Sequence, residues 1–504
     1  MAATDKAVVA TSRKKLTIVA RIGVFSYLCT IILPLITPKK STTMIRRLAC
    51  TALLAVALAA AQAQTNFDTP VSQMIEEMTP GWNLGNTMEA GNNANNFTNK
   101  GGLGAETSWQ QTKTTQQVID YVKARGFKSV RIPCAWVMGH LSDGTNYTID
   151  AQWMARVKEI VDYCLNANLY VIINDHWDGG WLENHIADSN INTINKNKTI
   201  LHTLWTQIAT AFRDYDERLL FAGLNEPNAD NQNATNNLIQ YEQVFIDAVR
   251  ATGGNNAQRV LVIQGPSTNI DHTCNFMKDN LPQDSAEGRL MIEVHYYNPW
   301  QFWGMEKDES WGKVFYYWGE GNHHPGSQHN ATWGEEAEMR SQLQKMKTNF
   351  VDKGIPVVIG EFGANWRNIS NLSGESQEKH NASIKAHYRE LHRLCKELGG
   401  MAPYTWDINV ANQNGTKGIM TLINRKELSV YCTYAMEGIN EIYPAPGSDP
   451  SGIAELPTAN ASETSSAVYN LQGVKVADCS HQDDLCSGIY VANGRKYVKR
   501  RTRQ

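Results

Sequence analysis

Two glutamates stand directly behind short apolar runs in the middle of this chain. Glu226 comes two residues after the run 219–224 ends, and Glu361 directly follows the run 356–360. Two carboxyl groups on opposite walls of one pocket suit glycoside cleavage. One must be protonated to assist the leaving oxygen, while the other must be ionised to attack or stabilise the anomeric carbon. This pair is therefore the first hypothesis for the chemistry of the chain.

Other polar and aromatic side chains also follow apolar runs. Arg131 suits a charge partner that keeps one carboxylate ionised, and Tyr297 suits a hydrogen-bond donor to the same group. For any single residue, a capping or solvated role at the rim explains the position equally well, whereas the whole set favours a reactive site. The further members are Asn86, His176, Asn225, His295, Trp406 and Asp407.

Apolar, β-branched runs alternate with longer amphipathic segments between residues 80 and 441. The expected strands are 82–84, 129–133, 170–174, 219–224, 259–264, 290–295, 356–360 and 402–406. The clearest expected helices are 114–125, 151–167, 199–213, 236–251, 335–352, 377–398 and 427–440. This alternation predicts an α/β fold, a (β/α)8 TIM barrel, whose reactive groups lie past the C-terminal ends of the strands. An open doubly wound sheet is disfavoured because no Gly-x-Gly-x-x-Gly opens a helix.

The N-terminal region has the pattern of a secretory leader. Residues 44–63 combine a basic start, an apolar run and the Ala61-Gln62-Ala63 cleavage site, which together are typical of a signal peptide. We therefore expect a secreted or cell-surface protein. Residues 1–43 are interpreted as a start-site extension or a weak anchor.

The amino-acid composition changes after the expected catalytic domain, residues 64–443. Residues 444–467 are rich in Pro, Ser, Ala, Thr and Gly and are expected to be a linker. Residues 468–504 predict a small C-terminal β module, with a hairpin turn at Asn493-Gly494. This tail resembles the C-terminal sorting tails of secreted Bacteroidetes proteins. The alternative is a small β-sandwich remnant without a sorting role.

Composition excludes several classes of partner. The net charge of −3 does not indicate a nucleic-acid-binding protein, which would be expected to carry an excess of positive charge. The nine cysteines include no CxxC, which disfavours a zinc ribbon. The loop 298–333 is rich in aromatic residues and suits either a cleft wall that stacks sugars or a self-packed small core. Its three histidines, 323, 324 and 329, have no neighbouring carboxylate or cysteine to complete a ligand set, so we expect no metal. We also expect no cofactor, and we expect the protein to be a monomer.

From about residue 68 to 443 the chain resembles glycoside hydrolase family 5, and within it the bacterial endoglucanases. No single motif is decisive, but together, in order and at strand ends, the motifs are highly specific. They are residues 81–86 (GWNLGN), 106–109 (ETSW), 130–133 (VRIP) with His140, 174–181 (NDHWDGGW), 224–227 (LNEP), 293–297 (EVHYY) and 359–363 (IGEFG).

The resemblance implies a role for each candidate. Glu226 would be the acid/base, Glu361 the nucleophile, and Asn225 would bind the sugar 2-hydroxyl. The supporting and substrate-binding residues would be Asn86, Arg131, His140, His176, His295, Tyr297 and Trp406. The family retains anomeric configuration, which places the carboxyls about 5–5.5 Å apart. Trp177 stands where the family often has a second histidine, which puts the fine substrate preference in doubt.

The expected function is therefore that of a secreted retaining endo-β-1,4-glucanase acting on a cellulose-type polysaccharide. Xyloglucanase, mannanase and mixed-linkage glucanase remain alternatives, because the residues that separate them are distributed over loops. A non-catalytic glycan-binding surface protein is the alternative of another class. It is disfavoured because such a protein would be expected to have lost one of the two glutamates.

Overall fold

The computed structural model describes residues 67–411 and 415–446, together with four short strands within residues 467–499. The expected start-site extension, the signal peptide and most of the linker lie outside the described residues. So do the two turn residues of the expected C-terminal hairpin, Asn493 and Gly494.

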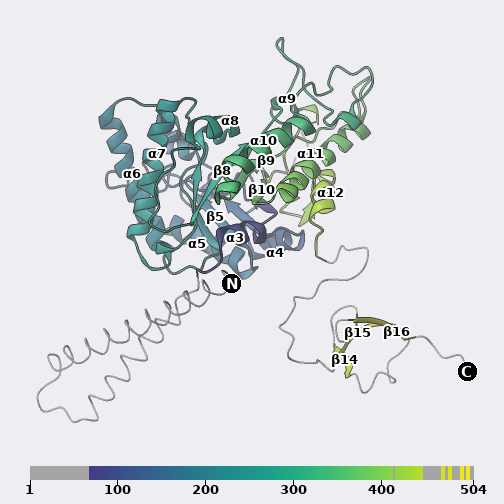
Figure 1. Ribbon diagram of the computed structural model, residues 1–504, viewed down its shortest axis with the longest axis horizontal. Helices are drawn as coiled ribbons and strands as arrows, with labels where there is room; N and C mark the ends of the chain where they lie inside the picture. The colour runs from purple at the N-terminus through teal and green to yellow at the C-terminus, as the bar shows by residue number, and fades with distance from the viewer. Residues whose placement is uncertain are drawn as a thin grey trace, which may run out of the picture.

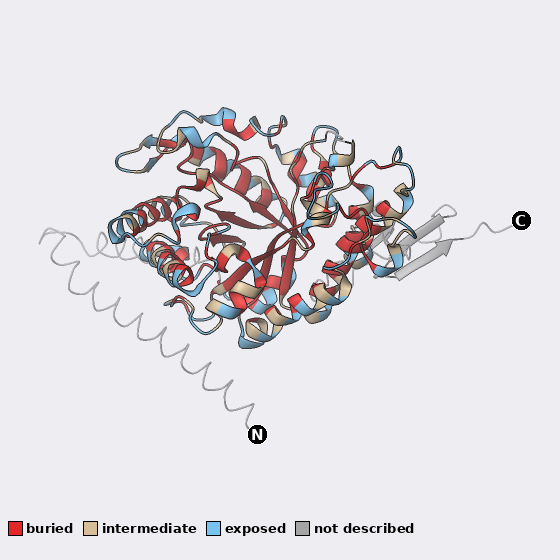
Figure 2. Ribbon diagram, turned by 90° about the horizontal axis from the view of Figure 1, so that it is seen from above, coloured by how far each residue is buried: buried red, intermediate tan, exposed pale blue. Residues whose placement is uncertain are grey.

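Eight parallel strands close into a barrel in the order β1-β2-β5-β6-β7-β8-β9-β10, and the fold is the predicted (β/α)8 barrel. Nearly all of the strand residues are buried, as the centre of Figure 2 shows, because helices cover the outer face of the barrel. The strands are β1 (Gly81–Asn83), β2 (Ser129–Ile132), β5 (Tyr170–Asn174), β6 (Leu219–Ala222), β7 (Leu261–Gln264), β8 (Leu290–Tyr296), β9 (Val357–Phe362) and β10 (Met401–Thr405).

The helices surround this barrel, and those that Figure 1 labels can be followed there by colour from purple to yellow. They are α3 (Val71–Glu77), α4 (Gln116–Ala124), α5 (Ala151–Asn166), α6 (Ile191–Ala211), α7 (Gln232–Ala251), α8 (Ile270–His272), α9 (Trp300–Trp303), α10 (Glu336–Asn349), α11 (Gln377–Leu398) and α12 (Thr433–Ile442).

Three helix starts differ from the expectation by four residues or more, each for a local reason. Helix α7 begins at Gln232 rather than residue 236, because the Asn231 side chain accepts the N–H of Asn233 at 3.0 Å and caps the helix. Helix α6 begins at Ile191 rather than residue 199, because the Asn190 side chain accepts the N–H of Asn192 at 2.9 Å and caps the helix earlier. Helix α12 begins at Thr433 rather than residue 427. The residues before it form a two-stranded hairpin of β11 (Ile423–Asn424) and β12 (Ser429–Val430).

Helix α3 closes the N-terminal end of the barrel. Its Met74 and Ile75 belong to one buried cluster with residues near the starts of several strands, among them Met291, Val358 and Ala402. Apolar packing therefore fills the lower part of the barrel, and polar side chains can gather only at the opposite end. That end is where the predicted site lies.

Two further small sheets lie outside the barrel. Strands β3 (Leu141–Asp143) and β4 (Thr148–Ile149) form a hairpin after β2. The C-terminal strands β13 (Ala467–Asn470), β14 (Lys475–Asp478), β15 (Gly488–Ala492) and β16 (Arg495–Lys499) form an antiparallel sheet in the order β14-β13-β15-β16. Strand β15 pairs with β16 from Ala492 opposite Arg495, as expected for a hairpin at that turn.

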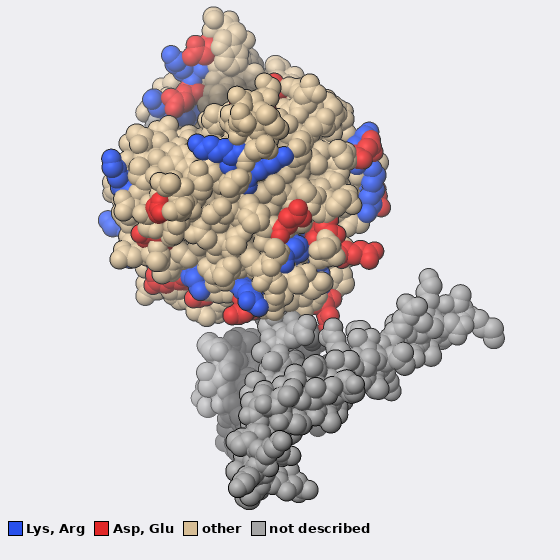
Figure 3. Space-filling model, turned by 90° about the vertical axis from the view of Figure 1, so that its left-hand side faces the viewer, with Lys and Arg blue, Asp and Glu red and all other residues tan. Residues whose placement is uncertain are grey.

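The surface carries charges of both signs. On the face shown in Figure 3, basic and acidic side chains are scattered without a broad area of one sign. Among the described residues, none of the helices has the length and apolar character needed to cross a membrane.

Candidate active site

Glu226 and Glu361 meet at the C-terminal end of the barrel. Glu361 lies in β9, and Glu226 lies on the loop that follows β6. One carboxylate oxygen of each glutamate and one ring nitrogen of His295 all lie within 4.8 Å of one another. Retaining glycosidases have carboxyls about 5–5.5 Å apart and inverting ones about 6.5–9.5 Å apart, so this spacing fits retention.

Glu361 is held firmly by two donors. Arg131 Nη1 donates to Oε1 at 3.0 Å, and the Tyr297 hydroxyl donates to Oε2 at 3.1 Å. The Glu361 side chain is only 7% exposed. Burial raises the pKa of Glu361, while the charges of His295 and Arg131 oppose that rise. Burial and the charge of Glu361 raise the pKa of Tyr297 well above its ordinary value, so its hydroxyl remains a donor.

Arg131 itself is fixed by neighbouring strand ends. Its Nη1 also donates to Asn83 Oδ1 at 3.1 Å, its Nη2 donates to Asn225 Oδ1 at 2.8 Å, and its Nε lies 2.9 Å from Glu293 Oε1. The guanidinium therefore connects Glu361 to Asn225, the neighbour of Glu226. Because Arg131 is fully buried, these partners leave it little freedom to move.

Glu293 is a site residue that sequence reasoning quoted in a motif but did not single out. It is fully buried and lies between Arg131 Nε and His295 Nε2, at 2.9 and 3.2 Å. A signal for it was present, because side chains two residues apart on a strand share a face. Glu293 and His295 share a face of β8, and Tyr297 continues this spacing just beyond the strand.

Glu226 is held in a different way. Its side chain is 46% exposed and accepts from His295 Nδ1 at 2.7 Å. Burial opposes the charge on Glu226, but the hydrogen bond and charge of His295, together with Arg131, lower the pKa of Glu226. For His295, burial is outweighed by the charge of Glu361 and the bonds to Glu226 and Glu293, which raise its pKa to about 10. In the free protein, the shared proton therefore resides on His295.

Glu183 is a second residue that the sequence did not point to. Its Oε1 accepts the backbone N–H of Glu226 at 2.6 Å. Burial raises the pKa of Glu183 to about 8; bonds from the Glu226 backbone and the Asn225 side chain oppose the shift, and the charge of Glu226 adds to it. Since the contact is to a backbone group and comes from a loop after β5, no residue pattern indicated it.

His176 and Trp406 form a flat wall beside the carboxyls. Their rings stack with centroids 5.7 Å apart and planes 7° apart. Burial and the charges of Arg131 and His295 lower the pKa of His176 well below its ordinary value, so the ring is neutral. Asn86 follows β1 with φ of 55°, and its backbone N–H donates to the Glu89 carboxylate.

The structure does not place His140 with these residues. Its ring stacks on Trp153 of α5, with centroids 3.6 Å apart, and it is only 1% exposed. Burial lowers the pKa of His140 to about 3, so the ring is uncharged. A substrate in the cleft cannot reach a side chain packed between the β2 loop and α5. The expected substrate contact is therefore wrong, and the role of His140 is one of packing.

The aromatic loop 298–333 combines the two alternatives considered for it. Tyr316 and Tyr317 form a small core with Met305, Val314 and Ile369, whereas Trp300, Trp311 and Trp333 are exposed. Two of the three loop histidines, His323 and His329, do have carboxylate neighbours, contrary to expectation, because Glu335 and Glu375 come from outside the loop. His329 Nδ1 lies 2.6 Å from Glu375 Oε1, and His323 Nε2 lies 2.8 Å from Glu335 Oε1. These contacts fasten the loop to the body of the barrel.

A (β/α)8 barrel with two carboxyls this close at its C-terminal end defines a class of enzyme, the glycoside hydrolases. Residues 90–412 match the family model described as Cellulase (glycosyl hydrolase family 5), and the chain belongs to that family. It is a glycoside hydrolase of the endo-β-1,4-glucanase type.

Two curated relatives and one solved structure illustrate the similarity. Endoglucanase A of Paenibacillus barcinonensis is 37% identical over 365 residues, which cover 68% of this chain and 84% of that protein. The xyloglucan-specific endo-beta-1,4-glucanase BoGH5A of Bacteroides ovatus is 36% identical over 352 residues, covering 68% of this chain and 65% of that protein, just under two thirds. The crystal structure of XEG5B, a GH5 xyloglucan-specific beta-1,4-glucanase from a ruminal metagenomic library in complex with XXLG, is 46% identical. It has a TM-score of 0.67 and covers 78% of this chain and 99% of that one.

Proposed function

We propose that Glu361 is the nucleophile and Glu226 the acid/base of a retaining double displacement on a β-1,4-glucan. The observation that carries this proposal is the carboxylate pair within 4.8 Å, with Arg131 and Tyr297 bound to only one member. Those two donors stabilise the ionised form of Glu361 and aim its oxygens. The other carboxyl stays open to water and to the leaving oxygen.

In the first step, a Glu361 oxygen attacks the anomeric carbon, the glycosidic bond breaks, and the leaving oxygen takes a proton from Glu226. A substrate that covers the exposed face of Glu226 removes water from it, which favours its protonated form. In the second step, Glu226 takes a proton from water, and that water replaces Glu361 at the anomeric carbon. Once Glu361 is a neutral ester, its charge no longer raises the pKa of Glu226, which can then act as a base.

We infer roles for the surrounding residues from their positions. Asn225, whose Oδ1 is held by Arg131, binds the sugar 2-hydroxyl. His295 carries the proton beside Glu226, and Trp406 with His176 forms the surface on which the sugar at the cleavage point stacks. Asn86 contributes a polar contact at the end of β1.

We propose a xylosyl-branched β-1,4-glucan, a xyloglucan, as the preferred substrate. Two of the three similar proteins described above support this proposal, because they are named for xyloglucan. The third carries the general name endoglucanase. A panel of xyloglucan, carboxymethylcellulose, lichenan, xylan and glucomannan, with product chain lengths, tests this. We expect the highest kcat/KM on xyloglucan and intermediate-length products. Higher activity on lichenan or glucomannan would show that xyloglucan is not the preferred substrate. The proposed double-displacement mechanism would be unaffected.

A glycan-binding protein without activity is the alternative of another class. The presence of both carboxyls, at catalytic separation, speaks against it. The same panel decides the question, because a binding protein would release no reducing sugar from any polysaccharide while still retaining oligosaccharides.

We also propose that the protein is exported as a monomer. In this proposal, residues 44–63 are removed, residues 64–443 form the catalytic domain and residues 444–467 the linker. Residues 468–504 act as a sorting signal for secretion. N-terminal sequencing of the secreted protein should start near Gln64. Deleting residues 468–504 should leave kcat unchanged and retain the enzyme inside the cell, whereas unchanged export would remove the sorting role.

A further inference from the structure

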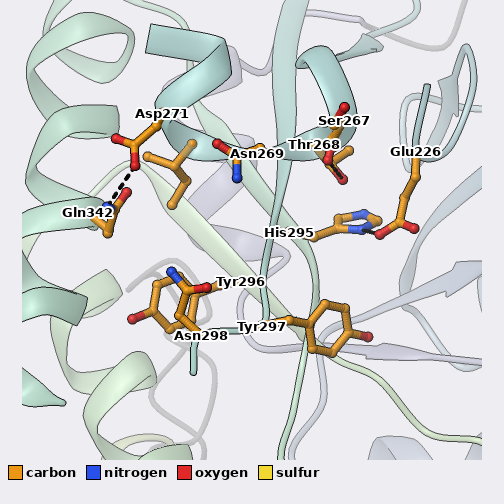
Figure 4. Close-up of a pocket in the computed structure, with 11 residues that line it drawn as sticks. Glu226, Ser267, Thr268, Asn269, Asp271, His295, Tyr296, Tyr297, Asn298 and Gln342 are labelled. Atoms are coloured by element: carbon orange, nitrogen blue, oxygen red, sulfur yellow. Dashed lines mark hydrogen bonds and ion pairs between the residues drawn. The ribbon is translucent and has the colours of Figure 1, made fainter. Parts of the chain in front are cut away.

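A cavity opens directly beside Glu226. It encloses about 160 Å³ and lies between the loop after β7 and the end of β8 (Figure 4). Glu226 and His295 form one end of this cavity, and Asp271 with Gln342 of α10 form the other. It therefore extends from Glu226 toward helix α10.

The walls of this cavity carry hydroxyl and amide groups. Ser267, Thr268 and Asn269 line one side, and Tyr296 and Asn298 line the other. Asn269 Oδ1 accepts the N–H of His272 at 3.0 Å, which orients the side chain, and within the described ranges its amide nitrogen has no partner. At the far end, Asp271 accepts from Gln342 at 3.1 Å and from Lys345 at 2.5 Å.

The lining of the cavity is suited to a polyhydroxylated ligand. Ser267 and Thr268 carry hydroxyl groups, and Asn269, Asn298 and Gln342 carry amides. Each of these groups can exchange hydrogen bonds with the hydroxyls of a sugar.

The position of the acid/base identifies which part of a substrate lies here. The leaving oxygen must contact Glu226, so the leaving segment of the glucan lies on the Glu226 side of the site. Tyr297, the donor to Glu361, lines the cavity at its Glu226 end, whereas Glu361 itself and the stacked pair His176 and Trp406 do not line it. This lining places the cavity on the leaving-group side, next to the point of cleavage.

We propose that this cavity receives a glycosyl branch carried by the leaving segment of a β-1,4-glucan. The inference rests on the proposed function, since it requires a branched substrate. An unbranched glucan follows the open cleft as a ribbon and has no group to place in a side cavity. A pentosyl branch that projects from the backbone would bring several hydroxyls between Asn269 and Gln342. Binding there is noncovalent and adds affinity only for branched leaving groups.

The test uses a cavity-filling variant, Gln342→Phe, with Gln344→Phe as its control. Gln344 lies on the same helix but is exposed and does not line the cavity. Three substrates separate the two sides of the site. Xyloglucan has branches on both sides, cellohexaose has none, and a nitrophenyl glycoside of the branched xyloglucan heptasaccharide has branches only on the side retained by the enzyme.

For Gln342→Phe, we expect the ratio of kcat/KM on xyloglucan to kcat/KM on cellohexaose to fall about 10-fold, the size of one lost pocket contact. The ratio of the heptasaccharide glycoside to cellohexaose should stay the same, and Gln344→Phe should change neither ratio. An equal fall in both ratios would place the cavity on the other side of the cleavage point. If neither ratio falls, the cavity does not bind a glycosyl branch.

Asn269→Asp provides a second variant if the phenylalanine disturbs folding. Aspartate keeps the acceptor that caps α8 but removes the amide donor. It should lower the same xyloglucan ratio, while an unchanged ratio would count against the proposal. Wild-type protein that cleaves cellohexaose but not xyloglucan would overturn the proposed substrate itself. Wild-type protein that cleaves xyloglucan, with variants that do not separate the substrates, would overturn only the cavity assignment.

Discussion

The two carboxyls proposed as catalytic, Glu361 and Glu226, are supported in different ways. Glu361 belongs to a strand, is 7% exposed, and is bound through its side chain by Arg131 and Tyr297. Glu226 belongs to a loop, is 46% exposed, accepts one side-chain bond from His295, and is also positioned through its backbone N–H by Glu183. The difference matches the two tasks. A nucleophile needs a fixed charge and direction, whereas an acid/base must exchange its proton during each turnover.

Removing the fixed carboxyl should have the largest effect. Glu361→Ala should lower kcat on xyloglucan by about 10³-fold or more, because no other group can form the glycosyl ester. Oligosaccharide affinity, measured by calorimetry, should remain largely intact. Residual activity above a few per cent would show that the strand-borne carboxyl is not the nucleophile.

Removing the open carboxyl should give a loss that depends on the leaving group. Glu226→Ala should slow polysaccharide hydrolysis by about 10²- to 10⁴-fold, the usual contribution of general acid catalysis. Aryl glycosides with good leaving groups need less proton transfer and should lose less activity in the glycosylation step, measured by pre-steady-state release of the phenol. If both kinds of substrate slow equally, Glu226 is not the acid.

Weakening the support of the fixed carboxyl should shift its titration. Tyr297→Phe removes one hydrogen bond to a charged group and should lower kcat/KM by about 10- to 100-fold. It should also raise the pKa of Glu361, which moves the acid limb of the pH profile to higher pH. Tyr317→Phe is the matched control, because the Tyr317 hydroxyl donates to Glu375 in the aromatic loop. An unmoved acid limb in Tyr297→Phe would contradict the supporting role.

The last prediction concerns the backbone support of the open carboxyl, and its effect is on stability, with the smallest effect on activity. Burial raises the pKa of Glu183 from its ordinary value of 4.5 to about 8. Between these values the unfolded chain releases the proton while the folded protein keeps it, so this group costs stability as pH rises. Glu183→Gln keeps an acceptor for the Glu226 N–H and removes that cost.

The variant should therefore gain unfolding free energy relative to wild type between pH 4.5 and 8, by up to about 4 kcal/mol. Urea denaturation at several pH values measures the difference. If the unfolding free energies of the two proteins change in parallel with pH, Glu183 is not a neutral buried carboxyl.

Much of this arrangement was predictable because strands carry a strong sequence signal. Continuous apolar runs located all eight barrel strands. One of these runs contains Arg131, and the residues just past three others are Glu226, Tyr297 and Glu361. Glu293 was within reach of the same reasoning, because it shares a strand face with His295. Strand alternation turns Glu293 to the same side of β8 as His295, where it forms an ion pair with Arg131.

The remaining residues depended on contacts that local patterns do not encode. Glu183 acts on a backbone N–H from a loop, and the partner of the His329 ring, Glu375, is distant in the chain. His140 was misassigned because a motif position was taken as a position in the cleft. In the structure the loop after β2 turns this ring onto Trp153 instead. Such loop paths follow from tertiary packing rather than from residue spacing.

The most direct test is to trap the covalent intermediate. The wild-type protein is incubated with a 2-deoxy-2-fluoro cello-oligosaccharide carrying a reactive leaving group, digested, and analysed by peptide mass spectrometry. We predict one glycosyl group per protein, attached to the peptide that contains Glu361, and faster labelling in wild type than in Tyr297→Phe. A label on Glu226, or full inactivation without any label on Glu361, would contradict the assignment of the two carboxyls.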